Sequence, residues 1–314
     1  MDRKPVSVKS YANIAIVKYW GKADAERMIP STSSISLTLE NMYTETKLSF
    51  LPEDATGDVM YIDDELQGEK ETTKASKVLD LFRTNPNQHV KIETWNNMPT
   101  AAGLSSSSSG LSALVKAANE LFQVGKTQSE LAQIAKFASG SSSRSFFGPL
   151  AAWDKDSGDV YQVETDLKLA MIMLVLTDQK KPVSSRDGMK LCTETSTSFP
   201  EWIKQSEQDY KDMLGYLKTN DFQAVGELTE ANALRMHQTT STANPPFSYL
   251  TDASYQAMDK VKALRASGER CYFTMDAGPN VKVLCLEEDL DRLADHFRKD
   301  YQVIVSRTKE LPDA

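Results

Sequence analysis

Several features are scarce in this 314-residue chain, and each scarcity removes a class of protein. It has three cysteines and three histidines, without the spacing of zinc ligands or of a disulfide framework. A metal-hydroxide hydrolase and a disulfide-stapled secreted domain are therefore disfavoured. The apolar run 169–177 is too short to span a bilayer, and residues 1–10 lack the apolar segment of a signal peptide. We expect a cytoplasmic protein with no membrane partner.

Charge and motifs exclude further classes. A net charge of −8 disfavours nucleic acid as a partner. Neither a Walker GxxxxGK[ST] sequence nor a GxGxxG after a strand is present, so the two common nucleotide-binding motifs do not apply. The first 22 residues nevertheless hold five lysines and arginines against one acid. Such a local basic cluster suits a small anionic ligand, or equally a solvated strand edge.

The hydrophobic pattern predicts an α+β fold with two domains, 1–178 and 179–314. In the first half it predicts strands at 6–17, 35–50, 59–62, 90–95 and 148–153, and helices at 73–83, 111–122 and 128–139. The second half opens with a strand at 169–177. Helices at 184–195, 200–219, 221–238, 251–267 and 288–299 and strands at 271–275, 281–286 and 301–306 complete a small antiparallel sheet with helices on one face.

Residues 99–110, PTAAGLSSSSSG, run directly into a helical pattern that starts at Leu111. A small-residue loop that opens a helix can bind an anion, because free backbone N–H groups and the helix dipole point at the charge. A flexible serine linker has a similar composition, but a linker would separate domains rather than begin an amphipathic helix. This segment therefore predicts a phosphate-binding turn.

Four other segments carry candidate chemistry, each with an ordinary structural alternative. The corner 19–22, YWGK, could hold a phosphate through Lys22 or simply end a strand with an aromatic anchor. The segment 139–145, SGSSSRS, offers hydroxyls and a guanidinium, or is a plain loop. Cations in 180–186 oppose the dipole of the helix that follows, a conflict that a bound anion would relieve. Asp276 lies between two apolar strands, where a turn residue is common.

With these segments in this order, the chain resembles the mevalonate diphosphate decarboxylases of the galactokinase, homoserine kinase, mevalonate kinase and phosphomevalonate kinase (GHMP) superfamily. The glycine-serine loop alone indicates the superfamily, whereas YWGK and MDAGPN (275–280) distinguish the decarboxylase from its kinase relatives. The chain departs from the family pattern GSAxRS at Ser142 and Ser143, and in its unbroken serine run. The resemblance implies an N-terminal ribosomal-protein-S5-like domain, a C-terminal ferredoxin-like sheet with helices, and an active site in the cleft between them.

The resemblance also implies the reaction. ATP, with Mg²⁺, would phosphorylate the 3-hydroxyl of (R)-mevalonate 5-diphosphate, and loss of phosphate and CO₂ would give isopentenyl diphosphate and ADP in the mevalonate pathway of isoprenoid biosynthesis. A homodimer is the family expectation. Two rivals stay open: a kinase of the same superfamily that stops after phosphorylation, and a non-catalytic relative that only binds phosphorylated metabolites.

Site residues carried over by motif follow from the same resemblance. Asp276 would act as general base or orient the hydroxyl, Lys18 would lie beside it, Arg144 would hold the substrate carboxylate, and Asn13 would orient the catalytic pair. Substrate would also contact Tyr19, Trp20, Gly21, Lys22, Ser139, Gly140, Ser141, Ser142, Ser143, Ser185, Arg186 and Lys70. Nucleotide would contact Asn96, Asn97, Gly103, Leu104, Ser105, Ser106, Ser107, Ser108 and Lys181, with Ser106 on Mg²⁺.

Overall fold

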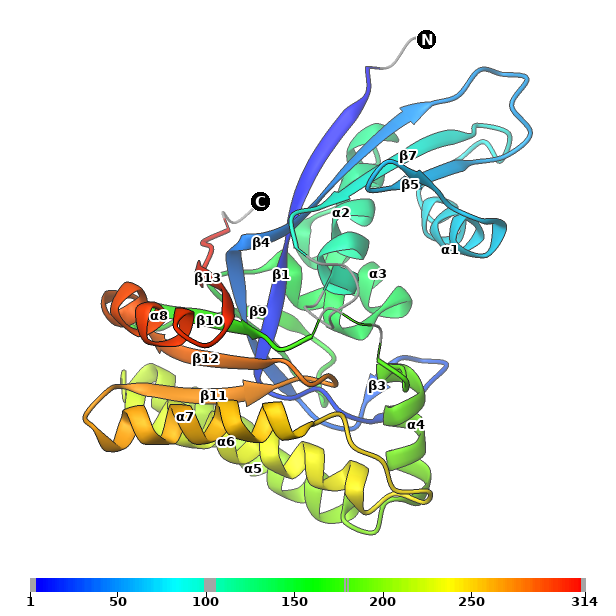
Figure 1. Cartoon of the computed structure of the whole chain (residues 1–314). Coiled ribbons are helices and arrows are strands. Elements are labelled where there is room, and N and C mark those ends of the chain that lie inside the picture. The colour runs from blue at the N-terminus through cyan, green and yellow to red at the C-terminus, as the bar shows by residue number, and fades with distance from the viewer. Residues whose placement is uncertain (1–3, 99–105, 178, 180, 312–314) are drawn as a thin grey trace.

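A computed structural model describes residues 4–98, 106–177, 179 and 181–311, apart from the side chain of residue 106. The N-terminal half is built on a seven-stranded sheet with the path β6-β5-β7-β4-β8-β9, in which β1 also pairs with β4 (Figure 1). All pairings are antiparallel except that of β5 with β7. The strands are β1 (Val6–Val17), β4 (Ser34–Phe50), β5 (Val59–Ile62), β6 (Glu65–Leu66), β7 (Val90–Asn96), β8 (Leu150–Trp153) and β9 (Val160–Val163).

Strand β4 organises this sheet because it is 17 residues long and has three neighbours. Its C-terminal part pairs with β7, its N-terminal part pairs with β8, and β1 runs along most of its length. A short hairpin of β2 (Lys22–Asp24) and β3 (Ile29–Pro30) follows β1. The end of β1, with its YWGK corner, therefore lies next to the start of β4.

Helices α1 (Glu69–Leu79), α2 (Ser106–Leu121) and α3 (Gln128–Ala138) and the 3₁₀ helix η1 (Gly140–Phe146) belong to the same half. Leu114 and Ala118 of α2 and Leu131 of α3 share a core cluster with Leu48 of β4 and Ile92 of β7. The α3 helix begins with a capping box between Thr127 and Glu130.

Two helices of this half begin several residues before the start that the sequence predicts. Helix α1 begins at Glu69 rather than 73, with Glu69 and Glu71 placing negative charge in the first turn, where the dipole favours it. Helix α2 includes Ser106–Gly110, which the hydrophobic pattern assigned to the loop. Small serines let this end of α2 approach the sheet, where Ser109 Oγ lies 2.7 Å from Thr44 Oγ1 of β4.

The C-terminal half holds the antiparallel sheet of four strands that the pattern predicted, and their order in the sheet is β11-β12-β10-β13. Its strands are β10 (Leu169–Val175), β11 (Cys271–Met275), β12 (Val281–Leu286) and β13 (Gln302–Arg307). The helices are α4 (Ser185–Thr195), α5 (Phe199–Lys218), α6 (Phe222–Ser241), α7 (Asp252–Ala266) and α8 (Leu290–Arg298), with a 3₁₀ turn η2 (Glu287–Asp289) before α8. Figure 1 shows α5, α6 and α7 on the side of the edge strand β11 that faces away from β12.

The second sheet is covered on both faces. Ile172 and Phe273 share a core cluster with Val261 of α7 and Phe297 of α8. Residues of the opposite face, such as Met171, pack instead with β1 and with α5 and α6. The prediction of helices on one face therefore missed the packing of the other face against the N-terminal half.

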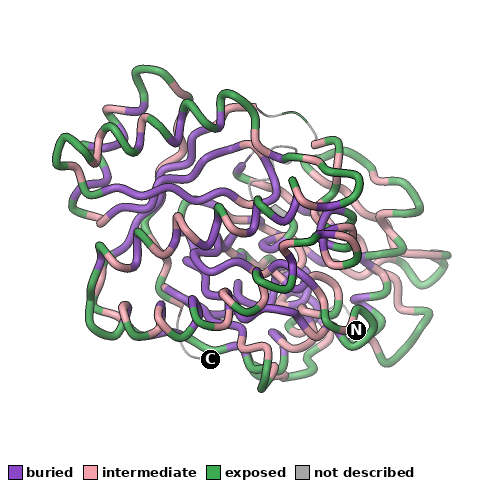
Figure 2. Tube along the Cα trace, turned by 90° about the horizontal axis from the view of Figure 1, so that it is seen from below, coloured by how far each residue is buried: buried purple, intermediate pink, exposed green. Residues whose placement is uncertain are grey.

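The two halves consequently share one continuous core, because Ile14 and Ile16 of β1 belong to the same cluster as Met171 and Leu284. Strand β10 pairs with β12 and β13, so a boundary before Leu169 keeps this sheet intact, whereas the expected boundary after residue 178 separates β10 from its partners. Figure 2 shows buried positions concentrated in the extended segments, while the helices expose their outer sides.

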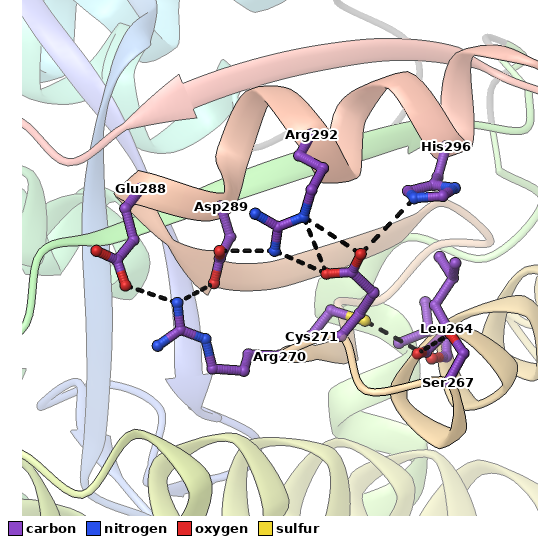
Figure 3. Close-up of polar contacts among 10 residues, drawn as sticks. Leu264, Ser267, Arg270, Cys271, Glu288, Asp289, Arg292 and His296 are labelled. Atoms are coloured by element: carbon purple, nitrogen blue, oxygen red, sulfur yellow. Dashed lines mark hydrogen bonds and ion pairs between the residues drawn. The ribbon is translucent and has the colours of Figure 1, made fainter.

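A chain of ion pairs fastens α8 to the start of β11 (Figure 3). Arg292 bridges Glu269 and Asp289, and Arg270 joins Asp289 to Glu288. Asp289 is buried, so two arginines compensate its charge.

In the described residues no helix combines the length and apolar composition needed to cross a bilayer.

Candidate functional site

Asp276 lies between two buried lysines at the junction of the halves. Lys18 Nζ, at the end of β1, is 2.7 Å from Asp276 Oδ1, and Lys282 Nζ, on β12, is 2.9 Å from Asp276 Oδ2. The lysine side chains are 2 % and 1 % exposed, whereas that of Asp276 is 26 % exposed. The carboxylate is therefore held from the protein side and keeps a face toward solvent.

This arrangement perturbs the charges. Burial opposes the ionised form of Asp276, but Lys18 and Lys282 outweigh it, so the pKa of this carboxyl lies well below its usual range. Burial lowers the pKa of Lys18 to about 8, and Asp276 offsets only part of this effect. Burial and the charge of Lys282 also lower the pKa of Lys181. A single carboxylate thus serves several cations, which leaves the cluster electropositive.

Helix α6 holds the end of β1 in place. The backbone N–H of Lys18 donates to Asn232 Oδ1 at 2.8 Å, and the indole Nε1 of Trp20 donates to Thr239 Oγ1 at 2.9 Å. Asn232 in turn donates to the buried carboxylate of Asp209 on α5. These contacts fix the backbone that carries Lys18 and Tyr19.

The turn that carries Asp276 is anchored by its own sequence. Asn280 Oδ1 accepts hydrogen bonds from the backbone N–H groups of Leu176 and Thr177, just after β10. Pro279 O accepts from the hydroxyl of Ser254, at the start of α7. The MDAGPN segment is therefore a rigid turn bound to β10 and α7.

A second cationic group lies beside Tyr19. Charge interactions connect Tyr19 with Arg144 and Arg186, and connect Lys22 with Arg186. Burial raises the pKa of Tyr19 to about 12, so its hydroxyl keeps its proton at neutral pH. Burial lowers the pKa of Lys22, and Arg186 adds to this effect. The YWGK corner, η1 and the start of α4 thus contribute to one electrostatic environment.

Arg144 is buried on η1 and held by two serines of β4. Its Nε donates to Ser36 Oγ at 3.0 Å and its Nη1 donates to Ser34 Oγ at 2.7 Å. Among the described residues no carboxylate forms an ion pair with it, although the charge of Asp276 acts on it. A buried guanidinium without a carboxylate partner suits an anionic ligand.

The serines around Arg144 divide into two groups. The hydroxyls of Ser142 and Ser143 are buried and donate to backbone carbonyls, those of Ser139 and Gly140. The hydroxyls of Ser142 and Ser143 therefore stabilise η1, in contrast to their expected role as substrate contacts. Ser139 and Ser141 are half-buried.

Trp20 is also removed from the expected substrate contacts. Its side chain is buried, and its indole N–H already donates to Thr239. Trp20 therefore serves as the aromatic anchor at the end of β1, the structural alternative that the sequence also allowed. The neighbouring Gly21 has φ of +114°, and a Cβ there would lie 2.5 Å from Phe199 Cζ, so its role in the corner is structural.

One other expected role differs in the structure. Asn13 donates to Ser141 O and Ser145 Oγ, so it ties β1 to η1 rather than orienting Lys18 and Asp276. Lys70 is exposed on α1, and its expected contact with substrate stays a prediction.

The nucleotide-binding prediction falls partly outside the described residues, which include neither Gly103, Leu104 and Ser105 nor the side chain of Ser106. The first turn of α2 contains no acidic residue, which leaves the positive end of its dipole uncompensated by such a side chain. Asn96 and Asn97 hydrogen-bond to β4 through Thr44 and Tyr43.

The start of α4 brings the remaining predicted cations to the site. Lys181 Nζ donates to Ser185 Oγ at 2.6 Å and to Ala277 O at 2.7 Å, next to Asp276. Ser184 caps the helix by accepting from Asp187 N. The cap and Asp187 relieve part of the conflict between these cations and the helix dipole.

Sequence reasoning missed two residues of the cluster. Lys282 lies in an apolar strand pattern, six residues after Asp276, and its position on the adjacent strand could have indicated a contact. His237 is buried on α6, where burial and the charge of Lys18 lower its pKa to about 4. No spacing signal indicated this histidine, because the fold alone brings it to Lys18.

The arrangement of the two sheets and the cationic cluster around Asp276 are those of the GHMP kinase class of ATP-dependent enzymes. Residues 10–163 match the family model of the diphosphomevalonate decarboxylase-like N-terminal domain, and residues 171–312 match that of the mevalonate 5-diphosphate decarboxylase C-terminal domain. The chain belongs to the diphosphomevalonate decarboxylase family.

Solved structures and curated relatives agree with this assignment. A structure of mevalonate pyrophosphate decarboxylase from Streptococcus pyogenes is 67 % identical, with a TM-score of 0.97, and the match covers 100 % of this chain and 99 % of that one. A structure of MDDEF in complex with MVAPP, AMPPCP and magnesium is 40 % identical, with a TM-score of 0.90 and 98 % of both chains covered. The diphosphomevalonate decarboxylase of Saccharomyces cerevisiae is 33 % identical over 91 % of this chain and 79 % of its own length.

Proposed function

We propose that Asp276, Lys18 and Arg144 carry the reaction of this chain. The reaction is the ATP-dependent decarboxylation of (R)-mevalonate 5-diphosphate to isopentenyl diphosphate, with ADP, phosphate and CO₂ as the other products, in the mevalonate pathway. The observation that supports the assignment of residues is the partly exposed carboxylate of Asp276 between two buried lysines, where the motif segments of both halves meet.

Leaving-group chemistry explains why ATP is needed. Hydroxide leaves a tertiary carbon poorly, whereas phosphate leaves readily once the 3-hydroxyl has been phosphorylated. As phosphate departs, positive charge develops at the carbon, and the electron pair of the breaking carbon–carboxylate bond forms the alkene and releases CO₂. The protein must therefore orient the hydroxyl and stabilise the negative charge of the transferred and departing phosphate.

We assign Asp276 to orient the 3-hydroxyl, with its solvent-facing side accepting the hydroxyl hydrogen. Its lowered pKa makes it a weak base, which favours orientation over proton abstraction before phosphoryl transfer. Lys18 keeps the carboxylate ionised and adds positive charge beside the transferred group. Arg144, held by Ser34 and Ser36, binds the substrate carboxylate until it is released as CO₂.

The diphosphate is assigned to the second cationic group. Lys22 and Arg186 bring positive charge from opposite halves, and Tyr19, Ser139, Ser141 and Ser185 add hydroxyls. Gly140 shapes this wall, because its missing side chain leaves room for Tyr19 and Trp153.

The nucleotide is assigned to the serine run at the start of α2, with Lys181, Asn96 and Asn97 as further contacts. Lys70 is assigned to the diphosphate of the substrate or to ATP. Mg²⁺ commonly binds to nucleotide phosphates and to few protein ligands, and the hydroxyl oxygen of Ser106 is assigned as one such protein ligand. When bound, this ion would neutralise phosphate charge during transfer.

Incubation with (R)-mevalonate 5-diphosphate, ATP and Mg²⁺ tests the function, with ADP, CO₂ and isopentenyl diphosphate measured together. Equal amounts of all three are expected. Release of ADP without CO₂ would identify a kinase, and substrate binding without ADP release would identify a non-catalytic relative. The Asp276→Asn variant serves as the matched control for contaminating ATPase activity.

Three further expectations are part of the proposal. The two domains divide between β9 and β10, supported by the pairing of β10 with the second sheet. The chain forms a homodimer, which light scattering would test. It acts in the cytoplasm, an expectation supported by three free, buried cysteines.

A further inference from the structure

Lys282 is a buried cation for which the proposed reaction has no assigned role. It lies on β12, opposite Thr274 of β11 and Met173 of β10, where an apolar residue would suit the centre of the sheet. Its side chain is 1 % exposed, and its ammonium group lies 2.9 Å from Asp276 Oδ2. Burying a second lysine against a carboxylate that is already paired with Lys18 requires an explanation, because unneutralised buried charge costs stability.

We infer that Lys282 is a positioning residue that fixes the rotation of the Asp276 carboxylate, and that this chain retains it at a cost in stability. The inference rests on the proposed function. Lys18 holds Oδ1 and Lys282 holds Oδ2, so the two contacts together define the carboxylate plane. One contact alone would leave the carboxylate free to turn about the bond that carries it. The exposed side of Asp276 would then face the substrate hydroxyl in a single orientation.

The geometry separates the two lysines by role. Lys18 also donates to Ala15 O at 2.7 Å and has its backbone N–H bound by Asn232, so it is tied to β1 and α6. Lys282 has Asp276 as its described hydrogen-bond and ion-pair partner. Replacing Lys282 should therefore break only its contact with Asp276 among the described hydrogen bonds and ion pairs, although loss of its charge should also raise the pKa of Lys18 and of Lys181.

The other charged and titratable groups that act electrostatically with Asp276 come from several elements. They are predominantly cationic, so Lys282 adds to an excess of positive charge that anionic substrates can neutralise on binding. These groups are Lys18 at the end of β1, Arg144 on η1, Lys181 before α4 and His237 on α6.

Replacement of Lys282 by methionine tests the inference, because methionine has a similar length and carries no charge. In the ligand-free protein, the ¹³Cγ resonance of Asp276, assigned by its absence in Asp276→Asn, should titrate at least about one pH unit higher than in the parent. The kcat should fall about tenfold or more, while the Kd for mevalonate diphosphate from calorimetry changes less. The melting temperature should stay equal or rise.

Two further variants sharpen the test. Lys282→Arg retains the positive charge and should restore the lower titration midpoint of Asp276. Arg83→Met breaks the buried Arg83–Asp58 ion pair in the N-terminal half, and should reduce the melting temperature without moving the Asp276 resonance.

An unchanged Asp276 titration in Lys282→Met, or a fall in melting temperature with parental kcat, would overturn the inference and leave Lys282 as a structural residue. Failure of the proposed function would instead appear as absence of isopentenyl diphosphate with the parent protein. The carboxyl titration can be read in either case, so the two failures are distinguishable.

Discussion

Lys18 and Asp276 are 258 positions apart in the sequence, yet their Nζ and Oδ1 atoms lie 2.7 Å apart. Lys18 directly follows the first strand of the N-terminal sheet, and Asp276 begins the turn after β11. The halves that carry them share a core through Ile14, Ile16 and Met171. The reactive pair is therefore assembled by close packing across the junction, and displacement of one half against the other would separate it.

Substitution of Asp276 by asparagine should remove most turnover while retaining substrate binding. The amide keeps the shape of the side chain but lacks the charge that attracts the substrate hydroxyl hydrogen and both lysines. We expect kcat to fall by at least about a hundredfold, because loss of the orientation of a reacting group can by itself cost about this much. Coupled measurement of ADP release and calorimetric binding of mevalonate diphosphate provide the two readouts. Turnover near that of the parent would remove Asp276 from the mechanism.

The pH dependence of kcat/KM should show an alkaline limb with a midpoint near pH 8. Burial lowers the pKa of Lys18 to about 8, so the free enzyme loses this positive charge as the pH rises through that value. Lys18→Arg keeps its charge and should shift the limb upward, even if its maximal rate is lower. Lys116→Met is the matched control, because Lys116 is another buried lysine with a pKa lowered to about 8. A limb that follows Lys116 and not Lys18 would contradict the assignment.

The contribution of Lys18 to the free energy of unfolding should rise with pH, whereas the activity falls. The folded-state pKa of Lys18 is about 8, below the ordinary lysine value of 10.5, so between these two pH values the unfolded chain binds more protons at this site than the folded chain does. The contribution of this lysine to the free energy of unfolding therefore rises with pH across that window, while activity falls. Denaturant unfolding of the parent and of Lys18→Met at pH 7 and pH 10 would isolate it. The free energy of unfolding of the parent minus that of Lys18→Met should be higher at pH 10 than at pH 7.

The sequence was most informative where local pattern and tertiary environment agree. Strand β1 and strands β11 and β12 have the predicted bounds, because their apolar residues are buried as the pattern requires. The contact of Lys18 with Asp276 was implied by resemblance alone, since no local signal connects positions so distant. Lys282 was missed because a lysine in an apolar strand is normally exposed at an edge, and here the carboxylate of Asp276 compensates its burial.

Most differences between the predicted and the observed site residues involve small polar residues, above all serines. Serine spacing cannot distinguish hydroxyls that face a ligand from those that donate into the fold, as Ser142 and Ser143 do. The same ambiguity hid the early start of α2, because Ser106–Ser109 have the composition of a loop. Sequence could indicate the segments of the site, whereas the role of each hydroxyl depended on packing.

Arg144→Lys should weaken binding of the substrate carboxylate even though the charge is retained. Arginine uses Nε and Nη1 to contact Ser36 and Ser34 and still presents N–H groups to a ligand, whereas lysine has one ammonium group for all partners. Loss of a hydrogen bond to a charged group corresponds to about 1.5–3 kcal/mol, or about a ten- to hundredfold rise in KM for mevalonate diphosphate. Ser36→Ala should have a smaller effect in the same direction. Equal kinetic constants for the parent and Arg144→Lys would show that the guanidinium geometry of Arg144 is not needed to bind the substrate carboxylate.

Gly140→Ala should impair substrate binding through Tyr19, although alanine adds only one methyl group. A Cβ at this position would lie 2.9 Å from Trp153 Cζ3 and 2.9 Å from Tyr19 Cε1, closer than packed carbons tolerate. Tyr19 packs on Trp153 with ring centroids 5.0 Å apart, so the methyl group must push Tyr19 or η1 out of place. We expect a higher KM for mevalonate diphosphate and a destabilisation of about 1–3 kcal/mol. Gly215→Ala, on the exposed side of α5 with no atom within 4 Å of the added Cβ, is the matched control. It should keep the parental KM and gain about 0.4–1 kcal/mol of stability, so a KM change shared by both variants would show that the effect at Gly140 is not local.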